Sequence, residues 1–193
     1  MSPETPISYA PTDGLTYDPE DAVYWDPAAL RKEVERTFEI CHGCRMCFKF
    51  CDSFPSLFDF IDQQDGDVRK LTDAQTQQVF DDCFQCKLCE VQCPYTVRDK
   101  HEYQLDFPRL VHRWDAQQVR SKGVPLAKRI LGDPDKAGQM ARASMGMANA
   151  MNRVGVHRWF MEKFLGVHRD KLLPDFAPQT FESWADSKGL IKD

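Results

Sequence analysis

The sequence predicts an all-α protein, and three observations support this prediction. Apolar residues recur at helical spacing along most of the chain. Helix-start signals, namely Asp-Pro pairs and a Thr-x-x-Gln capping pattern, stand before several of the apolar runs. No stretch shows the alternation and turn residues of a β-hairpin. With 193 residues, the chain is long enough for one small domain with a helical extension, and too short for a large enzyme.

The N-terminal half is expected to alternate helices with two cysteine-rich runs. Residues 1–25 are rich in Pro, Asp and Thr and lack periodicity, so they predict an extended arm that packs on the rest or stays mobile. Asp26 and Pro27 have the form of an N-cap followed by a proline, and predict a helix that leads to the first run. A short helix is expected in residues 56–63, and a helix that begins at Thr72 leads to the second run.

The C-terminal half keeps a helical pattern. Pro108 opens a segment that stops near Gly123, and Asp133 opens another whose small residues, at 137–152, form one stripe that includes Met145 as a core residue. A third helix ends at Gly166. The expected organisation is an extended arm at 1–25, a core with both cysteine runs at 26–106, and a helical extension at 107–193 that packs on the core or on a partner.

All eight cysteines lie in two copies of the spacing Cys-x2-Cys-x2-Cys-x3-Cys, in CHGCRMCFKFC at 41–51 and CFQCKLCEVQC at 83–93. The first three cysteines of such a run wrap the backbone around one point, so their thiolates converge on a single 4Fe-4S cubane. In two-cluster proteins with this run, the fourth cysteine ligates the other cluster. The spacing therefore predicts two 4Fe-4S clusters, one held by Cys41, Cys44, Cys47 and Cys93, and the other by Cys83, Cys86, Cys89 and Cys51.

A zinc-stapled structural or interaction module is the alternative to this interpretation. Tetrahedral zinc sites typically use two Cys-x2-Cys knuckles, and a third cysteine three residues further on does not fit that plan. Disulfides are disfavoured because the N-terminus has no secretion signal, so the sequence predicts a cytoplasmic protein in a reducing compartment. No stretch approaches the roughly 18 consecutive apolar residues of a membrane span, so no span is expected.

Charge is divided unevenly along the chain. Residues 107–172 hold 13 Lys and Arg against 5 Asp and Glu, whereas the remainder holds 12 against 25. The basic segment has no nucleic-acid motif, so its charges are interpreted as solvated helix faces and no nucleic-acid partner is expected. The acidic half predicts a docking edge for a basic surface on a redox partner. That edge would lie near Asp52, Asp81, Asp82 and Glu90.

Other residues near the cysteines have simpler interpretations. His42 is expected to be a partly exposed loop residue, because cysteine supplies every cluster ligand. Asp52 follows the fourth cysteine of the first run, whereas Pro94 follows the fourth cysteine of the second run. A backbone N–H that points at a cluster sulfur here would raise the reduction potential of the cluster, whereas a nearby carboxylate would lower it. The sequence leaves open which effect is larger. A dry shell around the clusters is expected from Phe48, Phe50, Phe84, Leu88 and Val91.

The stretches CHGCRMCFKFCDSFP, CFQCKLCEVQCPY and, more loosely, LDFPRL at 105–110 carry a resemblance. The chain resembles, over residues 25–185, a family of two-cluster iron-sulfur subunits, namely those related to the one in heterodisulfide reductase and to the one in anaerobic glycerol-3-phosphate dehydrogenase. Together with the 31-residue spacer between the runs, the resemblance favours an α-helical ferredoxin fold.

The resemblance also implies a role. It implies electron transfer between a flavin or thiol-disulfide partner and a second carrier. Many longer relatives continue into cysteine-rich domains with CCG motifs, and this sequence has no cysteine after Cys93. It also lacks a G-x-G-x-x-G turn and a P-loop, so flavin, nicotinamide and nucleotide sites are not supported. The chain is thus expected to be an electron-transfer component without an evident active site, serving a flavoprotein or a protein with CCG domains.

Overall fold

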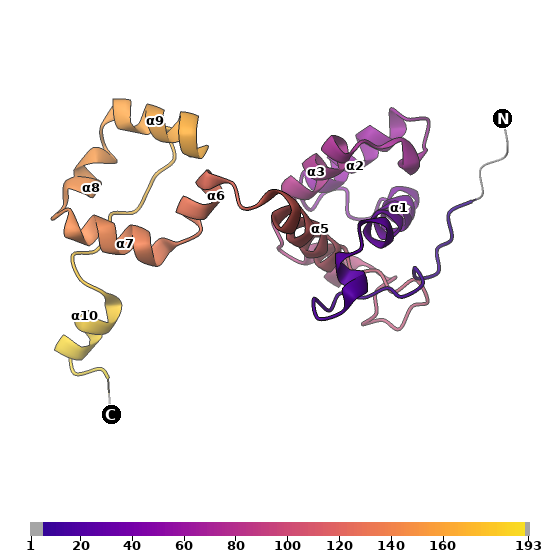
Figure 1. Ribbon diagram of the computed structural model, residues 1–193, viewed down its shortest axis with the longest axis horizontal. Coiled ribbons are helices and arrows are strands. Elements are labelled where there is room, and N and C mark those ends of the chain that lie inside the picture. Colours follow the sequence, from indigo (N-terminus) through magenta and orange to yellow (C-terminus); the bar gives the residue numbers. More distant parts are fainter. Residues whose placement is uncertain (1–5, 192–193) are drawn as a thin grey trace. The chain divides into compact units, whose positions relative to one another are not determined.

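The computed structural model describes residues 6–191 and is drawn in Figure 1. Within these residues the protein is all-helical, as the sequence predicts, and the only extended pairing is one bridge between Thr96 and Leu105. The chain divides into two compact units, Met1–Lys122 and Gly123–Asp193. The helices of the first unit are η1 (Ala22–Trp25), α1 (Pro27–Cys44), α2 (Ser53–Asp62), η2 (Val68–Lys70), α3 (Asp73–Asp81), α4 (Leu88–Gln92) and α5 (Phe107–Lys122).

Helix α1 begins where the sequence predicts. The Asp26 carboxylate accepts a hydrogen bond from the Ala28 N–H at 3.0 Å, and Pro27 occupies the first turn. The helix continues past its expected end and includes both Cys41 and Cys44. It ends at Arg45, whose backbone is left-handed with φ of 53°. The first two cysteines are therefore held on a rigid helical turn.

Helices α2 and α3 pack against each other between the two cysteine runs. Helix α3 begins with the predicted capping box, in which Thr72 and Gln75 satisfy each other's backbone N–H groups. The buried Ser53 hydroxyl donates to the Val79 carbonyl at 2.7 Å, and Ser56 donates to the Asp82 carboxylate at 2.7 Å. These bonds join the start of α2 to the end of α3, where the second cysteine run begins.

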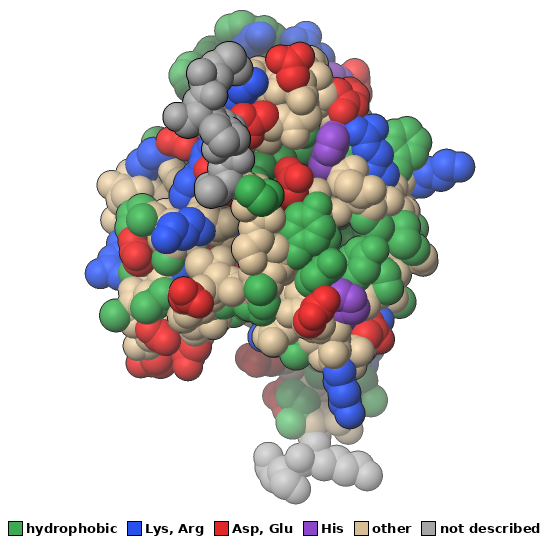
Figure 2. Space-filling view, turned by 90° about the vertical axis from the view of Figure 1, so that its right-hand side faces the viewer, with side chains coloured by type: hydrophobic (Ala, Val, Ile, Leu, Met, Phe, Trp, Pro, Cys, Tyr) green, Lys and Arg blue, Asp and Glu red, His purple; other side chains and the backbone are tan. Residues whose placement is uncertain are grey.

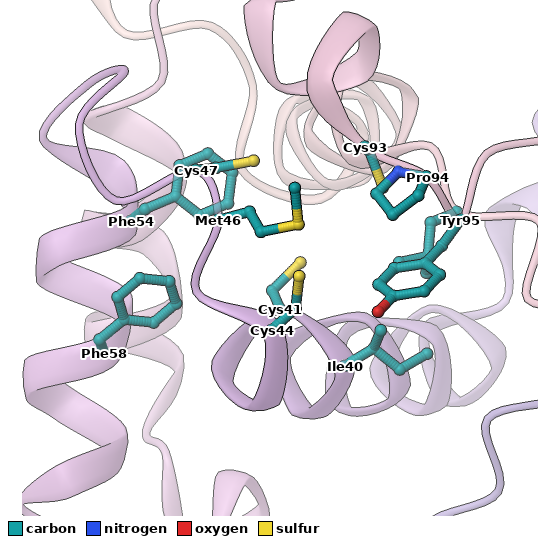
Figure 3. Close-up of a pocket in the computed structure, with 11 residues that line it drawn as sticks. Ile40, Cys41, Cys44, Met46, Cys47, Phe54, Phe58, Cys93, Pro94 and Tyr95 are labelled. Carbon is teal, nitrogen blue, oxygen red and sulfur yellow. The ribbon is translucent and has the colours of Figure 1, made fainter.

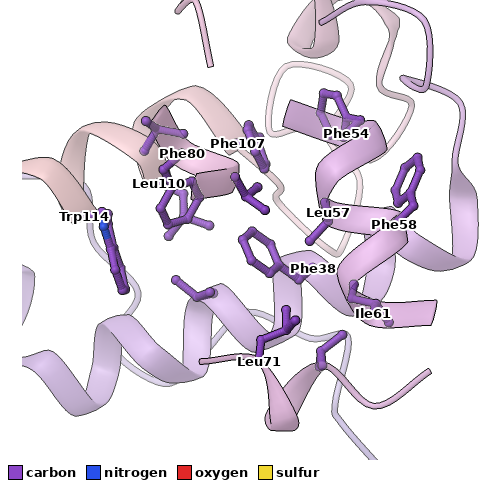
Figure 4. Close-up of a cluster of buried hydrophobic side chains, with 14 of the residues drawn as sticks. Phe38, Phe54, Leu57, Phe58, Ile61, Leu71, Phe80, Phe107, Leu110 and Trp114 are labelled. Atoms are coloured by element: carbon purple, nitrogen blue, oxygen red, sulfur yellow. The ribbon is translucent and has the colours of Figure 1, made fainter. Parts of the chain in front are cut away.

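Aromatic side chains from four helices form the centre of the core (Figure 4). The rings of Phe54 and Phe107 have centroids 4.9 Å apart, those of Phe38 and Phe80 are 5.4 Å apart, and those of Phe80 and Trp114 are 5.3 Å apart. Helix α5 contributes Phe107 and Trp114 and packs against α1. Because this apolar face belongs to the core, the first compact unit extends beyond residue 106 to Lys122.

The described part of the N-terminal arm is fastened to the core by buried ionic groups. Thr12 and Tyr17 donate hydroxyl hydrogen bonds to the Glu33 carboxylate, at 2.9 and 3.2 Å. Arg113 donates to the carbonyls of Tyr24 and Val23 at 2.9 and 2.5 Å. Residues 6–25 therefore pack on the core, and residues 1–5 lie outside the described part of the chain.

The second unit buries little of its apolar surface. Its buried residues include Ala141, Arg158 and Ala185. The helix expected over residues 137–152 is wrong as one element, because Met145 and Gly146 adopt positive φ of 49° and 90° and break it. Met145 is 95 % exposed, so it does not fill a core. The helices of this unit are α6 (Leu126–Leu131), α7 (Pro134–Ala143), α8 (Met147–Met151), α9 (Gly155–Leu165) and α10 (Phe181–Ser187).

Other signals in this unit are confirmed. Asp133 caps α7, and Gly166 ends α9 with φ of 72°. None of the helices in residues 6–191 combines the length and apolar character that crossing a membrane requires.

Candidate iron-sulfur centres

Each of the two cysteine runs has a residue with left-handed backbone conformation after its second cysteine. Arg45 and Lys87 each follow the second cysteine of their run, and both adopt left-handed backbone with φ of 53° and 62°. Residues other than glycine rarely adopt this conformation, and such positions concentrate at functional sites. After this residue, the third cysteine of each run lines the same hollow as the first two.

The first run shapes a hollow of about 310 Å³ (Figure 3). Cys41 and Cys44 come from the last turn of α1, and Cys47 follows in the loop. Cys93 reaches the same hollow from the second run, so the structure brings together the cysteines that the spacing assigns to one cluster. The other lining residues are mainly apolar and include Ile40, Met46, Phe54, Phe58, Pro94, Tyr95 and Leu105.

The second run shapes another hollow. Cys83, Cys86 and Cys89 line it together with Cys51 from the first run. Phe54 lines both hollows. A third hollow lies between the two sets, lined by Cys41, Cys47, Cys89, Cys93 and Phe107 among others.

The cysteine side chains fit an iron-sulfur group chemically. All eight are free thiols. Within residues 6–191, no three His, Cys, Asp or Glu side chains are arranged to hold a single metal ion. Each set of four cysteines lines a hollow with mainly apolar walls, and four cysteine thiolates are the usual ligands of a 4Fe-4S cluster.

Burial controls the protonation of these thiols. Burial first, and then the neighbouring cysteines, raise the pKa of Cys47 to about 11 and that of Cys89 to about 12. The pKa of Cys41 is also raised well above its usual value by burial, and then by Cys93. Crowded thiolates in such a place repel one another, so the protons are displaced only when a cation binds.

Backbone N–H groups also point at the sulfurs. The Cys51 sulfur accepts hydrogen bonds from the N–H groups of Ser53 and Phe54, at the start of α2. The Cys93 sulfur accepts one from the Tyr95 N–H. Both contacts lower the pKa of their thiol, against the larger effect of burial. At Cys51 the N–H groups of Ser53 and Phe54 lower the pKa of the thiol, and the Asp52 carboxylate raises it.

The expected dry shell is confirmed only in part. Phe84 and Val91 are 72 % and 66 % exposed, and Phe48 and Leu88 are also exposed, whereas Phe50 is partly buried. Leu88 and Val91 belong to helix α4, which is only five residues long. Phe50 and Phe84 do line the second hollow, and Phe54, Phe58 and Phe107 form further parts of the walls. Phe54 could have been found from the sequence, because it lies one helical turn after Cys51.

His42 is not a loop residue, because it belongs to the last turn of α1. Its Nε2 lies 2.8 Å from the Asp62 carboxylate, and Arg45 reaches the same oxygen at 2.6 Å. Hydrogen bonds from Arg45 and His42 lower the pKa of Asp62. The Arg45 guanidinium also lies over the Phe58 ring, 5.2 Å from its centroid. This group joins the ends of α1 and α2 beside the first hollow.

Comparison with known families indicates the class of this domain. Residues 40–98, which contain both cysteine runs, match the family model of the 4Fe-4S dicluster domain. The chain thus contains a dicluster domain, and its eight cysteines imply two 4Fe-4S clusters and electron transfer.

One known protein shows a more distant similarity to the chain than the family model does. The chain is similar to citrate utilization protein B of Escherichia coli, with 29 % identity over 95 residues. The matched region is 49 % of this chain and 22 % of that protein, so the chain corresponds to under a quarter of the relative's length. No solved structure matches the chain.

Proposed function

We propose that this chain relays single electrons through two 4Fe-4S clusters, as a subunit or domain of a heterodisulfide reductase-like or flavin-linked oxidoreductase. One observation carries the proposal: two hollows are each lined by four cysteines, three from one run and one from the other. The clusters, when bound, supply one-electron chemistry. The chain's residues hold them in mainly apolar walls that Phe54 shares, which keeps the two sites adjacent.

The ligand sets proposed from this sorting are Cys41, Cys44, Cys47 and Cys93 for the first cluster, and Cys83, Cys86, Cys89 and Cys51 for the second. Serine variants test them, because serine replaces one thiolate and perturbs the cluster it serves. Cys44→Ser and Cys86→Ser provide reference spectra for damage to the first and the second cluster. The electron paramagnetic resonance of Cys93→Ser should then change like that of Cys44→Ser. A Cys93→Ser spectrum that matches Cys86→Ser would contradict the crossed assignment.

Metal content distinguishes the relay from the zinc module. Protein assembled anaerobically should contain about eight iron and eight acid-labile sulfide per chain, because each cubane has four of each. It should also be brown, with a broad visible absorption band. Stoichiometric zinc with little iron would overturn the proposed function.

The proposed partner is a redox protein, either a flavoprotein or a protein with cysteine-rich CCG domains. Cys86 is the exposed cysteine, and the exposed apolar side chains of Phe84 and Leu88 flank it. Hydrophobic side chains also form a group among charged ones on the face shown in Figure 2. Electron-transfer contacts are commonly small and steered by charge, so an accessible cluster edge beside acidic residues suits a basic partner surface.

The acidic docking edge can now be tested more sharply than from the sequence. Asp52 and Asp81 are exposed, whereas Asp82 is partly buried and accepts the Ser56 hydrogen bond, so its substitution would also loosen the fold. Asp52→Asn with Asp81→Asn should slow reduction by the partner, and salt above about 0.1 M should slow the wild type, since the screening length there is about 10 Å. Asp13→Asn, an exposed position in the arm, is the control with the same kind of charge change. If the rate of reduction by the partner changes neither with salt nor in the Asp52→Asn, Asp81→Asn double variant, this docking edge is refuted.

A further inference from the structure

Tyr95 contacts the first hollow in two ways. Its ring lines the hollow together with Cys41, Cys44 and Cys93, and hydrogen bonds from its backbone N–H to Cys93 and from its hydroxyl to Cys44 contribute to the pKa shifts of Cys93 and of Tyr95 itself. Figure 3 shows the ring across the hollow from the end of α1, with the hydroxyl turned towards Cys41 and Cys44. One residue from the second cysteine run thereby contacts two of the four sulfurs proposed for the first cluster.

The second hollow has a different set of donors. The Cys51 sulfur accepts the N–H groups of Ser53 and Phe54, and the sulfurs of Cys83 and Cys89 accept those of Gln85 and Glu90. All of these donors belong to the backbone, which substitution of a side chain leaves in place. The side chains of Gln85 and Lys87 also line the second hollow. The two hollows therefore differ in the kind of side chain that they present, and the tyrosine hydroxyl belongs to the first.

The Tyr95 ring is held in position by its neighbours. Its centroid lies 4.9 Å from that of His101 and 5.4 Å from that of Tyr103. The Tyr95 carbonyl accepts a hydrogen bond from the Leu105 N–H at 2.9 Å. A ring fixed on several sides keeps its hydroxyl near the sulfur without the entropy cost of ordering a free side chain.

From this geometry we infer that the Tyr95 hydroxyl sets the reduction potential of the first cluster by donating a hydrogen bond to the Cys44 sulfur. The inference rests on the proposed function. Hydrogen bonds to cluster sulfurs adjust the potential. Reduction adds negative charge to the cluster and its sulfurs, so a donor hydroxyl stabilises the reduced form more than the oxidised form and raises the potential. The backbone donors around both hollows remain when this hydroxyl is removed.

The test is a redox titration followed by electron paramagnetic resonance, on anaerobically assembled protein. Tyr95→Phe removes the hydroxyl and keeps the ring. Tyr103→Phe is the matched control, because it removes a hydroxyl from the adjacent ring of the same aromatic group. In Tyr95→Phe, we expect the midpoint of one cluster to become more negative by about 59 mV, which is a tenfold change in a one-electron equilibrium. The cluster affected should be the one that Cys44→Ser perturbs, and Tyr103→Phe should shift neither midpoint.

A second measurement keeps the inference testable if Tyr95→Phe assembles poorly. Wild-type protein whose tyrosines carry a ring fluorine has more acidic hydroxyls that donate more strongly, so the first midpoint should rise at mildly acidic pH. An unchanged midpoint in either experiment, or an equal shift in Tyr103→Phe, would overturn the role of Tyr95 while both clusters remain present. Absence of the clusters from the wild type would instead refute the proposed function.

Discussion

The buried ion pair of Glu33 and Arg36 allows a quantitative test of what holds the arm to the cluster domain. Glu33 is 0 % and Arg36 is 2 % exposed. Two hydrogen bonds join them, from Arg36 Nε to Oε2 at 2.8 Å and from Nη2 to Oε1 at 2.7 Å. Arg36 Nη1 also donates to the carbonyls of Tyr9 and Tyr103, at 2.9 and 2.7 Å. One guanidinium thus connects α1, the arm and the chain segment beyond the second cysteine run.

The substitution Arg36→Met keeps a long apolar side chain and removes the charge. It leaves a buried carboxylate without its cation, which typically costs about 3–5 kcal/mol. The hydroxyls of Thr12, Tyr17 and Thr37 still reach Glu33, so we expect the lower half of that range. For a chain of this length, about 3–4 kcal/mol corresponds to a fall in the melting temperature of about 6–16 °C, at roughly 2–4 °C per kcal/mol.

The assay is thermal unfolding of the assembled protein, followed by circular dichroism under anaerobic conditions at one scan rate. Arg109→Met is the matched control, because Arg109 is 67 % exposed and its pair with Asp106 is 3.4 Å long. Such surface pairs contribute about 0–1 kcal/mol. The double variant Glu33→Leu with Arg36→Met should recover much of the loss, because it removes the unpaired charge. If Arg36→Met melts within 2 °C of Arg109→Met, on the scale of about 2–4 °C per kcal/mol, this account of the pair is refuted.

Three further predictions concern a tyrosine, a turn and the second unit. Burial and the Glu33 carboxylate raise the pKa of Tyr17 well above its usual value. In the unfolded chain, Tyr17 ionises at about pH 10. The protonated Tyr17 therefore stabilises the folded state fully below that pH, and this stabilisation is lost as pH rises towards the pKa of the folded state. Denaturant unfolding should show this alkaline loss weakened in Tyr17→Phe, and identical pH profiles would count against it. Lys87→Gly should raise the melting temperature by about 2–4 °C, because it relieves about 1 kcal/mol of left-handed strain, and a lower melting temperature would show that the lysine side chain contributes more. Arg158 donates to the carbonyls of three residues in the segment 168–171, so Arg158→Met should speed proteolysis there without altering the visible absorption of the clusters, and unchanged cleavage would contradict this role.

Local patterns in the sequence determined most of the helix starts and the chemistry of the cysteines. The N-cap at Asp26, the capping box at Thr72 and the stop at Gly166 each depend on residues within one or two helical turns, so they can be recognised without the fold. The repeated cysteine spacing is likewise local, because three thiols on one wrapped segment converge whatever the rest of the chain does. These signals predicted an all-α protein with two clusters.

Only the tertiary structure decided which residues surround the cysteines. Phe54 and Phe107 line the second hollow from helices far apart in the chain, and Tyr95 reaches Cys44 across the first hollow from the other run. Leu88 and Val91 lie between ligands on the five-residue helix α4, yet their side chains are exposed. In the sequence, Glu33 has the pattern of a surface residue on an amphipathic helix. In the structure, the arm and Arg36 enclose its carboxylate. Burial is a property of contacts between distant segments, and periodicity along one segment does not contain that information.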